Sequence, residues 1–196
     1  MKGFNYKKAV QALNFFAIKT GGEINKMKAL KLIWLSDRLH LRKYARTILS
    51  DTYFALPYGP VASGTKDLIE GTDFLSEIER EYRNQYIIYT DKYNYKSIND
   101  FYSKVFSKSD IETMSIIFEK YGLIDEFTLS KISHFFPEWN KFEQQLASKS
   151  ASRIEMDYKD FFLDCEKGYN SVFETNPDSL ALAKDIFLEN CELGAR

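Results

Sequence analysis

Three side chains that often perform acid–base chemistry, Asp37, His40 and Asp51, lie close together in the sequence. A carboxylate beside an imidazole is an arrangement with which hydrolases activate water or a hydroxyl group. No nucleophile elbow and no glycine-rich phosphate loop accompanies these residues. A hydrolase that uses Asp37 and His40 is therefore an alternative only, and we expect a protein that is not an enzyme and has no catalytic residue.

A metal site or a cofactor is also not expected. The only histidines are His40 and His134, and the only cysteines are Cys165 and Cys191. Neither cysteine belongs to a CxxC pair, and neither histidine has a second ligand one helical turn away, whereas a protein metal site needs at least three ligands. We expect both histidines to be hydrogen-bonded structural residues.

The helix that carries Asp37 is expected to begin after an N-cap at Asn25 and to run to about Tyr44. Its apolar residues occupy two sides, so it is expected to be the central helix of the domain. Asp37 falls near the middle of one apolar arc, where an ionised carboxylate is costly unless it is hydrogen-bonded or paired. We interpret it as an anchor for the Tyr58-Gly59-Pro60 turn, for Tyr58 or for a core arginine. Two alternatives for Asp37 stay open: it could be a general acid or base, or it could contact a partner.

Four basic residues of the same helix share a narrow arc, here called the basic arc: Lys28, Lys31, Arg38 and Arg42. Such an arc is usually the solvated side of a helix. It could instead bind an acidic partner or nucleic acid. No helix-turn-helix spacing accompanies it, which argues against nucleic acid as a partner.

The other elements are mostly helical, and the fold class is mainly α (α+β). We expect a compact helical domain around the central helix, with a small antiparallel β element and extra C-terminal helices. The predicted elements are a helix from Tyr6 ended by Gly21-Gly22, strands at Thr52–Leu56 and Tyr86–Tyr89, a helix from Pro60 to Gly71, a helix with a Ser109/Glu112 capping box that ends at Gly122, a helix from Thr128 that Pro137 ends or kinks, and helices at Tyr158–Glu166 and Asp178–Glu192.

The composition sets limits on location and partners. With 27 basic and 28 acidic residues the formal charge is −1, so no global field attracts nucleic acid or an anionic membrane. The N-terminus lacks the apolar run of a signal peptide, and no stretch has the ~20 apolar residues of a membrane span. We expect a cytoplasmic protein without a membrane partner.

Four blocks of the sequence occur in the order and spacing of a known family. They are LKLIWLSDRLHLRKY from Leu30, DTYFALPYGPV from Asp51, SDIETMSIIFEKYG from Ser109 and LSKISHFFPEWNKF from Leu129. With them the chain resembles the Panacea antitoxin domain, the SocA-like domain associated with phages and mobile genetic elements. The resemblance covers about residues 10–142. It departs from the family where Lys43-Tyr44 and Leu49-Ser50-Asp51 replace glycine-containing segments, and where Glu138 stands in place of a small residue.

The resemblance implies an antitoxin of a toxin–antitoxin system, which neutralises a cognate protein toxin by direct binding. An adaptor that hands the partner to a protease is a variant of this function, and a nucleic-acid-binding regulator is the main alternative. The chain is divided at residue 147 into a Panacea-like domain (1–147) and a helical C-terminal extension (148–196), which is expected to carry the partner-specific contacts and to be dispensable for folding.

Two groups of residues are assigned on this basis. The residues expected to contact the partner are Arg38, Arg42, Tyr53, Tyr58 and Trp139. The residues expected to be structural are Asp37, His40, Asp51, Gly59, Pro60 and His134.

Overall fold

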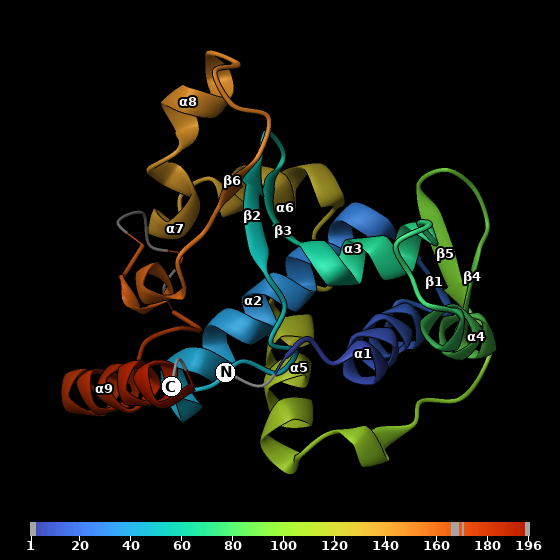
Figure 1. The fold of residues 1–196 in the computed structure, drawn as a ribbon, viewed down its shortest axis with the longest axis horizontal. Coiled ribbons are helices and arrows are strands. Elements are labelled where there is room, and N and C mark those ends of the chain that lie inside the picture. Colours follow the sequence, from blue (N-terminus) through green and yellow to red (C-terminus); the bar gives the residue numbers. More distant parts are fainter. Residues whose placement is uncertain (1–2, 166–168, 170, 195–196) are drawn as a thin grey trace.

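One helix, α2 (Lys26–Tyr44), lies at the centre of the fold, with the other elements arranged around it (Figure 1). The computed structural model describes residues 3–165, 169 and 171–194. Asn25 caps α2, since its side chain accepts hydrogen bonds from the backbone N–H groups of Met27 (2.9 Å) and Lys28 (3.4 Å). Every residue from Ala29 to Arg42 is buried, so the prediction of a central helix is confirmed.

Several segments distant in sequence cover α2. Helix α5 (Lys108–Tyr121) packs along it, and α6 (Glu126–Ser133) and the C-terminal helix α9 (Pro177–Gly194) also contact it. Helix α1 (Tyr6–Lys19) ends at the predicted place, before Gly21 and Gly22, which both have positive φ angles. The mainly α prediction is confirmed.

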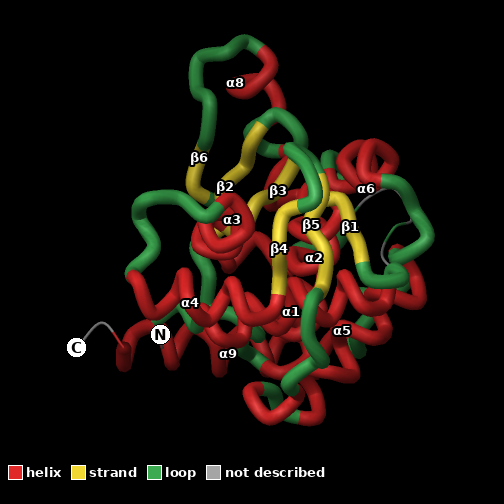
Figure 2. Tube along the Cα trace, turned by 90° about the vertical axis from the view of Figure 1, so that its right-hand side faces the viewer, coloured by secondary structure: helices red, strands yellow, loops and turns green. Residues whose placement is uncertain are grey.

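The β element consists of two three-stranded antiparallel sheets (Figure 2). In one sheet, β1 (Glu23–Asn25) and β4 (Ile87–Tyr89) flank β5 (Asn94–Ser97). In the other, β3 (Gly59–Ala62) and β6 (Ile154–Glu155) flank β2 (Tyr53–Leu56). The β2–β3 hairpin pairs Tyr53 with Ala62 and Leu56 with Gly59. A strand from beyond residue 147 therefore completes the second sheet.

Shorter helices connect these parts. They are α3 (Ser63–Glu70), α4 (Glu77–Tyr86), the 3₁₀ turn η1 (Ser103–Val105), α7 (Pro137–Asn140), α8 (Glu143–Ala147) and the 3₁₀ turn η2 (Tyr158–Phe162).

Three local predictions were wrong. Pro60 lies in β3 and does not open a helix; α3 begins at Ser63. The capping box of α5 is formed by Ser107 with Asp110, two residues before the predicted pair. The predicted Tyr158–Glu166 helix is a 3₁₀ turn that ends at Phe162, and Glu166 lies outside the described residues.

The segment after residue 147 contributes to the core. Phe161 and Phe173 have no exposed surface, and Phe187 of α9 is 5% exposed. Arg42 of α2 donates to the backbone carbonyls of Phe162 (2.7 Å) and Phe173 (3.2 Å). The division at residue 147 stays a prediction, but these contacts argue that the first part does not fold without the second.

We therefore predict that deletion of residues 150–196 abolishes cooperative unfolding. The deletion removes buried Phe161 and Phe173, and loss of one buried phenylalanine side chain typically costs about 3–5 kcal/mol of a total stability of about 5–15 kcal/mol. Near-UV circular dichroism during a thermal melt is the measurement. Truncation after Glu192, which removes the exposed Leu193 and the last residues, is the control. A sharp melt of the shorter chain would contradict the prediction.

Candidate functional site

Asp37 holds the segment that follows α2. Its Oδ1 accepts hydrogen bonds from the backbone N–H groups of Ile48 (2.7 Å) and Leu49 (3.3 Å), and the Tyr53 hydroxyl donates to Oδ2 (2.9 Å). Asp37 thus binds residues 48–49 and Tyr53, whereas the Tyr58-Gly59-Pro60 turn, Tyr58 and a core arginine were the expected partners. Burial raises the pKa of Asp37 to about 7, although the bonds from Ile48 and Tyr53 oppose this shift.

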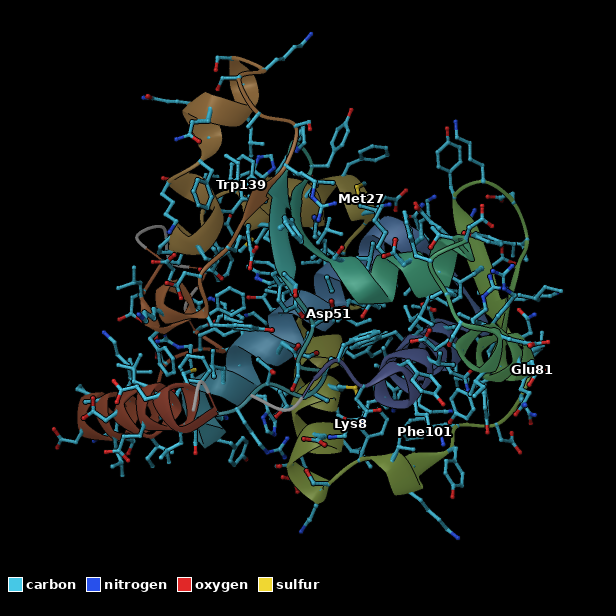
Figure 3. All side chains as sticks on the ribbon, viewed as in Figure 1. Lys8, Met27, Asp51, Glu81, Phe101 and Trp139 are labelled. Atoms are coloured by element: carbon cyan, nitrogen blue, oxygen red, sulfur yellow. The ribbon has the colours of Figure 1, made fainter. Side chains whose placement is uncertain are left out.

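Asp51 organises the beginning of α3. Its Oδ1 accepts from the backbone N–H of Gly64 (2.8 Å), and its Oδ2 accepts from the N–H and the hydroxyl of Thr65 (both 2.7 Å). The N-cap residue Ala62 has no side chain that could do this. Figure 3 shows Asp51 next to α2 at the centre of the molecule. This carboxylate therefore replaces a local helix cap.

His40 belongs to a separate polar cluster. Its Nδ1 lies 2.8 Å from the carbonyl of Arg46, and its Nε2 lies 3.1 Å from Asp110 Oδ1. Asp110 also binds Lys8 (2.7 Å) and Arg46 (2.8 Å). Burial opposes ionisation of Asp110, but the bonds from His40 and Lys8 outweigh it and hold its pKa well below the usual range. His40 thus bonds to a different set of groups from Asp37, which removes the geometric basis for a shared catalytic role.

The prediction of a solvated basic arc was wrong for three of its four residues, since only Lys28 keeps partial exposure. Arg38 has no exposed surface, and its Nε lies 2.9 Å from Oε1 of Glu138, which is also fully buried. The guanidinium lies 4.9 Å from the ring centroid of Phe136 and 4.8 Å from that of Phe173. The residue that departs from the family pattern, Glu138, is therefore the buried partner of Arg38.

Arg42 is bound by carbonyl groups of the C-terminal segment. It donates to the carbonyls of Phe162 and Phe173 and forms an ion pair with Asp164 (2.5 Å). Carbonyl acceptors occur at every residue type, so no sequence pattern could reveal them. The helical wheel placed Arg42 correctly but could not show that a remote segment covers it.

A third group of bonds holds the β2–β3 hairpin. Lys31 Nζ donates to the carbonyl of Pro60 (2.8 Å), Ser130 donates to the carbonyl of Tyr58 (2.9 Å), and Trp139 Nε1 donates to that of Leu56 (2.8 Å). Trp139 lies near the upper part of β2 in Figure 3. The hairpin is thus attached to α2 and to the α6–α7 region.

Trp139 and Gly59 have close neighbours in this region. The ring of His134 stacks on Trp139 at a centroid distance of 3.7 Å and an interplanar angle of 4°. Burial and the nearby Lys31 lower the pKa of His134 to about 4, so His134 is neutral near pH 7. Gly59 has φ +99°, and a Cβ there would lie 2.1 Å from Ser133 Oγ and 2.8 Å from Lys31 Nζ. Only glycine fits this position.

The residues expected to contact a partner differ in how much of their surface is exposed. Arg38, Arg42, Tyr53 and Trp139 are at most 2% exposed, so in this conformation they offer no contact surface. Tyr58 is 68% exposed and stays a candidate contact. The side chains assigned as structural, in contrast, all lie in or next to the bonded groups described above.

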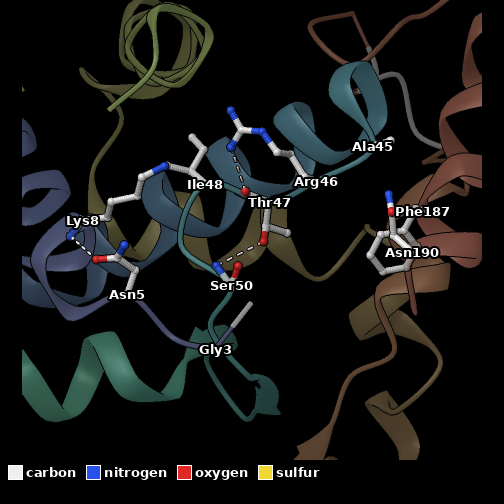
Figure 4. A pocket seen from close by; sticks show the side chains of 10 residues that line it. All are labelled: Gly3, Asn5, Lys8, Ala45, Arg46, Thr47, Ile48, Ser50, Phe187 and Asn190. Carbon is white, nitrogen blue, oxygen red and sulfur yellow. Dashed lines mark hydrogen bonds between the residues drawn. The ribbon is translucent and has the colours of Figure 1, made fainter. Parts of the chain in front are cut away.

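Two surface hollows border these groups. A cleft of about 750 Å³ lies between the segment 45–50, the residues before and at the start of α1, and α9. Figure 4 shows the residues that line it. Its charged residues Lys8 and Arg46 are both already paired with Asp110. A smaller groove of about 300 Å³ lies beside the β2–β3 hairpin and includes Lys31 and Tyr58. In the part of the chain that the structure describes, no group of three potential metal ligands comes together.

The comparison with family models gives one match. Residues 30–140 match the model described as "Antitoxin SocA-like, Panacea domain". The chain belongs to this family. No curated protein and no solved structure gave a match.

The Panacea match runs from Leu30, within α2, to the end of α7 and leaves out α1, η2 and α9. It is shorter than the range of about 10–142 expected from the sequence. Asp37, Asp51 and the Arg38–Glu138 pair therefore lie inside the matched region together with their main partners. The carbonyl groups that bind Arg42 lie outside it. No helix in the described ranges has the length and the apolar character needed to cross a membrane.

We predict that Asp37→Asn changes how stability depends on pH. Folded Asp37 keeps its proton up to about pH 7, whereas an unfolded aspartate loses it near its ordinary pKa of 3.8. The wild-type free energy of unfolding should therefore fall, relative to that of the variant, as the pH rises from about 4 to 7.5. A fall of at least about 1 kcal/mol is expected, since one pKa unit corresponds to about 1.4 kcal/mol.

Denaturant titrations at several pH values measure this difference. Asp73→Asn, at an exposed position, is the matched control and should leave the difference flat. A flat difference for Asp37→Asn as well would contradict the assigned protonation.

We predict that Gly59→Ala lowers the free energy of unfolding by about 2–4 kcal/mol, because the left-handed backbone and the clash with Ser133 both add to the cost. Gly71→Ala is the control, since Gly71 also has a positive φ (+61°) but nothing lies within 4 Å of the added Cβ. It should cost only about 1 kcal/mol. Equal losses in the two variants would show that the close packing at Gly59 is unimportant.

Proposed function

We propose that this protein is an antitoxin that neutralises a cognate protein toxin in the cytoplasm by binding it directly. The observation that carries this proposal is membership of the SocA-like Panacea family. The finer parts of the proposal, namely direct binding, a single cognate toxin and the cytoplasm as the place of action, extend beyond the family match.

The internal geometry supports a binding role. Asp37, His40, Asp51 and Arg38 are all buried and bonded to backbone or side-chain groups of neighbouring segments. These bonds hold the loops and the β2–β3 hairpin in place, which is what a preorganised binding surface requires. A stable complex would bury about 1,200–2,000 Å² of surface.

The alternatives lose their main support. The basic arc was the reason to consider nucleic acid, but Lys31, Arg38 and Arg42 are at most 1% exposed. The hydrolase alternative used Asp37 and His40, which are buried and bonded to different groups. An adaptor that passes the bound partner to a protease is compatible with the proposal, since it also begins with binding.

Co-expression tests the proposal. The small protein encoded by the neighbouring reading frame is produced alone and together with this chain, and growth is recorded. We expect growth arrest by the small protein alone, recovery with both, and co-elution of the two in size-exclusion chromatography. Growth arrest that persists in the presence of this chain would refute the proposal for that pair.

Tyr58→Ala sharpens this test, because the Tyr58 side chain is exposed and only its backbone carbonyl takes part in holding the hairpin. The variant is expected to weaken recovery while the melting temperature stays within a degree or two. Tyr93→Ala, at a 57% exposed tyrosine in the β4–β5 turn, is the matched control and should behave as the wild type. Equal recovery with both variants would exclude Tyr58 as a contact.

A further inference from the structure

The C-terminal helix α9 packs on the rest of the protein with one of its sides. Ala183 and Phe187 on that side are each 5% exposed, and the Phe187 ring lies 6.0 Å from the ring of Tyr158 and 5.8 Å from that of Phe162, measured between centroids. Figure 1 shows α9 at the edge of the molecule, where it contacts α2 and η2. The opposite side of this helix therefore faces outward.

The outward side of α9 carries an apolar strip. Leu182, Ile186 and Leu193 are 61%, 41% and 67% exposed. At about 100° per residue, they lie within about 40° of one another on the helical wheel. Because an α-helix rises about 1.5 Å per residue, the strip extends over about 16 Å, or three turns. Apolar side chains in such a row are the pattern with which one helix packs on another.

Four carboxylates border this strip on one side, within about 80° of Leu182 on the wheel. They belong to Asp178, Asp185, Glu189 and Glu192, which are all exposed. In the part of the chain that the structure describes, none of the four forms an ion pair. The only basic residue of α9, Lys184, lies toward the packed side. The strip and its acidic border are here called the α9 face.

The positions of these acids leave their charge uncompensated. Asp185 and Glu189 are one helical turn apart (i, i+4), a spacing at which like charges repel each other. Glu192 lies in the last turn of α9, where the helix dipole already places negative partial charge and favours cations, and this turn contains no basic residue. Cations that arrive from a partner would relieve both effects.

The chemistry of the α9 face selects the kind of partner. Nucleic acid and anionic membranes would be repelled by the acidic border. A second copy of this chain would bring the same acids and no cation, since the α9 face itself has none. An extended strand docks on the backbone groups of a sheet edge, which a helix does not offer. A helix with its own apolar strip and a row of lysines or arginines matches both parts of the α9 face.

We propose that the α9 face binds a basic amphipathic helix of the partner protein. Its apolar side chains would pack on Leu182, Ile186 and Leu193, and its basic side chains would pair with the acidic border. The inference rests on the proposed function, because the neutralised protein is the partner that would supply this helix. The α9 face lies outside residues 30–140, which match the family model. The contact therefore belongs to this chain and not to the domain that the family shares.

Fluorescence anisotropy with three labelled peptides tests the proposal. The first is acetyl-KLAKALKKLAKALKKL-amide, a basic amphipathic helix. The second is acetyl-KLLKAKALKALLKAKK-amide, which has the same composition but no apolar strip, and the third has glutamate in place of every lysine of the first. We expect the first peptide to bind at least about tenfold more tightly than the other two. Added salt should weaken its binding, because exposed ion pairs are screened.

Leu182→Lys removes an apolar contact and places a cation opposite the basic partner, so it should weaken binding of the first peptide at least about tenfold. Leu123→Lys is the matched control, since Leu123 is 95% exposed between α5 and α6 and lies outside the α9 face. It should bind as the wild type does. If Leu182→Lys does not fold, the comparison of the three peptides on the wild type decides the question.

The acidic border has its own variant. Asp185→Asn combined with Glu189→Gln should weaken the first peptide at low ionic strength and reduce the dependence of its affinity on salt. Asp73→Asn combined with Glu119→Gln removes the same charge from exposed positions outside the α9 face and should leave both quantities unchanged.

Several outcomes would overturn the proposal: no binding of the first peptide at submillimolar concentration, equal affinity for the scrambled or the acidic peptide, or unchanged affinity in Leu182→Lys. A dimer of this chain that Leu182→Lys dissociates in sedimentation equilibrium would overturn it as well, because a second copy would then occupy the α9 face.

The co-expression assay separates this proposal from the proposed function. Leu182→Lys is expected to lose recovery of growth, and Leu123→Lys to keep it. Full recovery with Leu182→Lys would refute the α9 contact and leave the antitoxin proposal intact. Specific binding of the first peptide without recovery by the wild type would instead refute the antitoxin proposal for that pair.

Discussion

Most of the central helix is buried, so the charged side chains of its buried part must find their partners inside the protein. From Ala29 to Arg42 no residue of α2 is solvated, and this range contains Asp37 as well as Arg38. The charged side chains in this range bond to different covering segments, namely residues 48–49, the α7 region, the C-terminal turn and the β2–β3 hairpin. The apolar sides of the helix provide the driving force for packing, and the polar groups select which segments pack where.

The segment after α2 illustrates how this selection works. Ala45 and Ser50 both have positive φ angles (58° and 55°), a conformation that costs L-residues roughly 1–2 kcal/mol. The family resemblance places glycine-containing segments near these positions, where this chain has none. The backbone N–H groups of Ile48 and Leu49 donate to Asp37, and the N–H of Ser50 donates to Thr47 Oγ1 (3.1 Å). These bonds hold the turn in this conformation. The carboxylate thereby offsets strain that glycines would avoid.

Periodicity in the sequence was sufficient to predict the central helix, its N-cap at Asn25 and the anchoring role of Asp37, because all three depend on local pattern and on the cost of burying a charge. It could not predict the groups that Asp37 binds, since backbone N–H groups of a loop have no residue signature. The same limit explains the error at Arg42, whose acceptors are carbonyls more than a hundred residues away. Glu138 was noted in the sequence only as a departure from the family pattern, and the structure alone shows it to be the buried counter-charge of Arg38.

The bonds between Arg42 and the carbonyls of Phe162 and Phe173 have a consequence during synthesis. A growing chain emerges from the ribosome in order, so α2 leaves the exit tunnel long before the segment that covers it. Until that segment is available, two guanidinium groups and their aromatic neighbours remain uncovered, and such surfaces favour aggregation. We therefore expect nascent chains of this protein to engage chaperones until the last quarter has been translated.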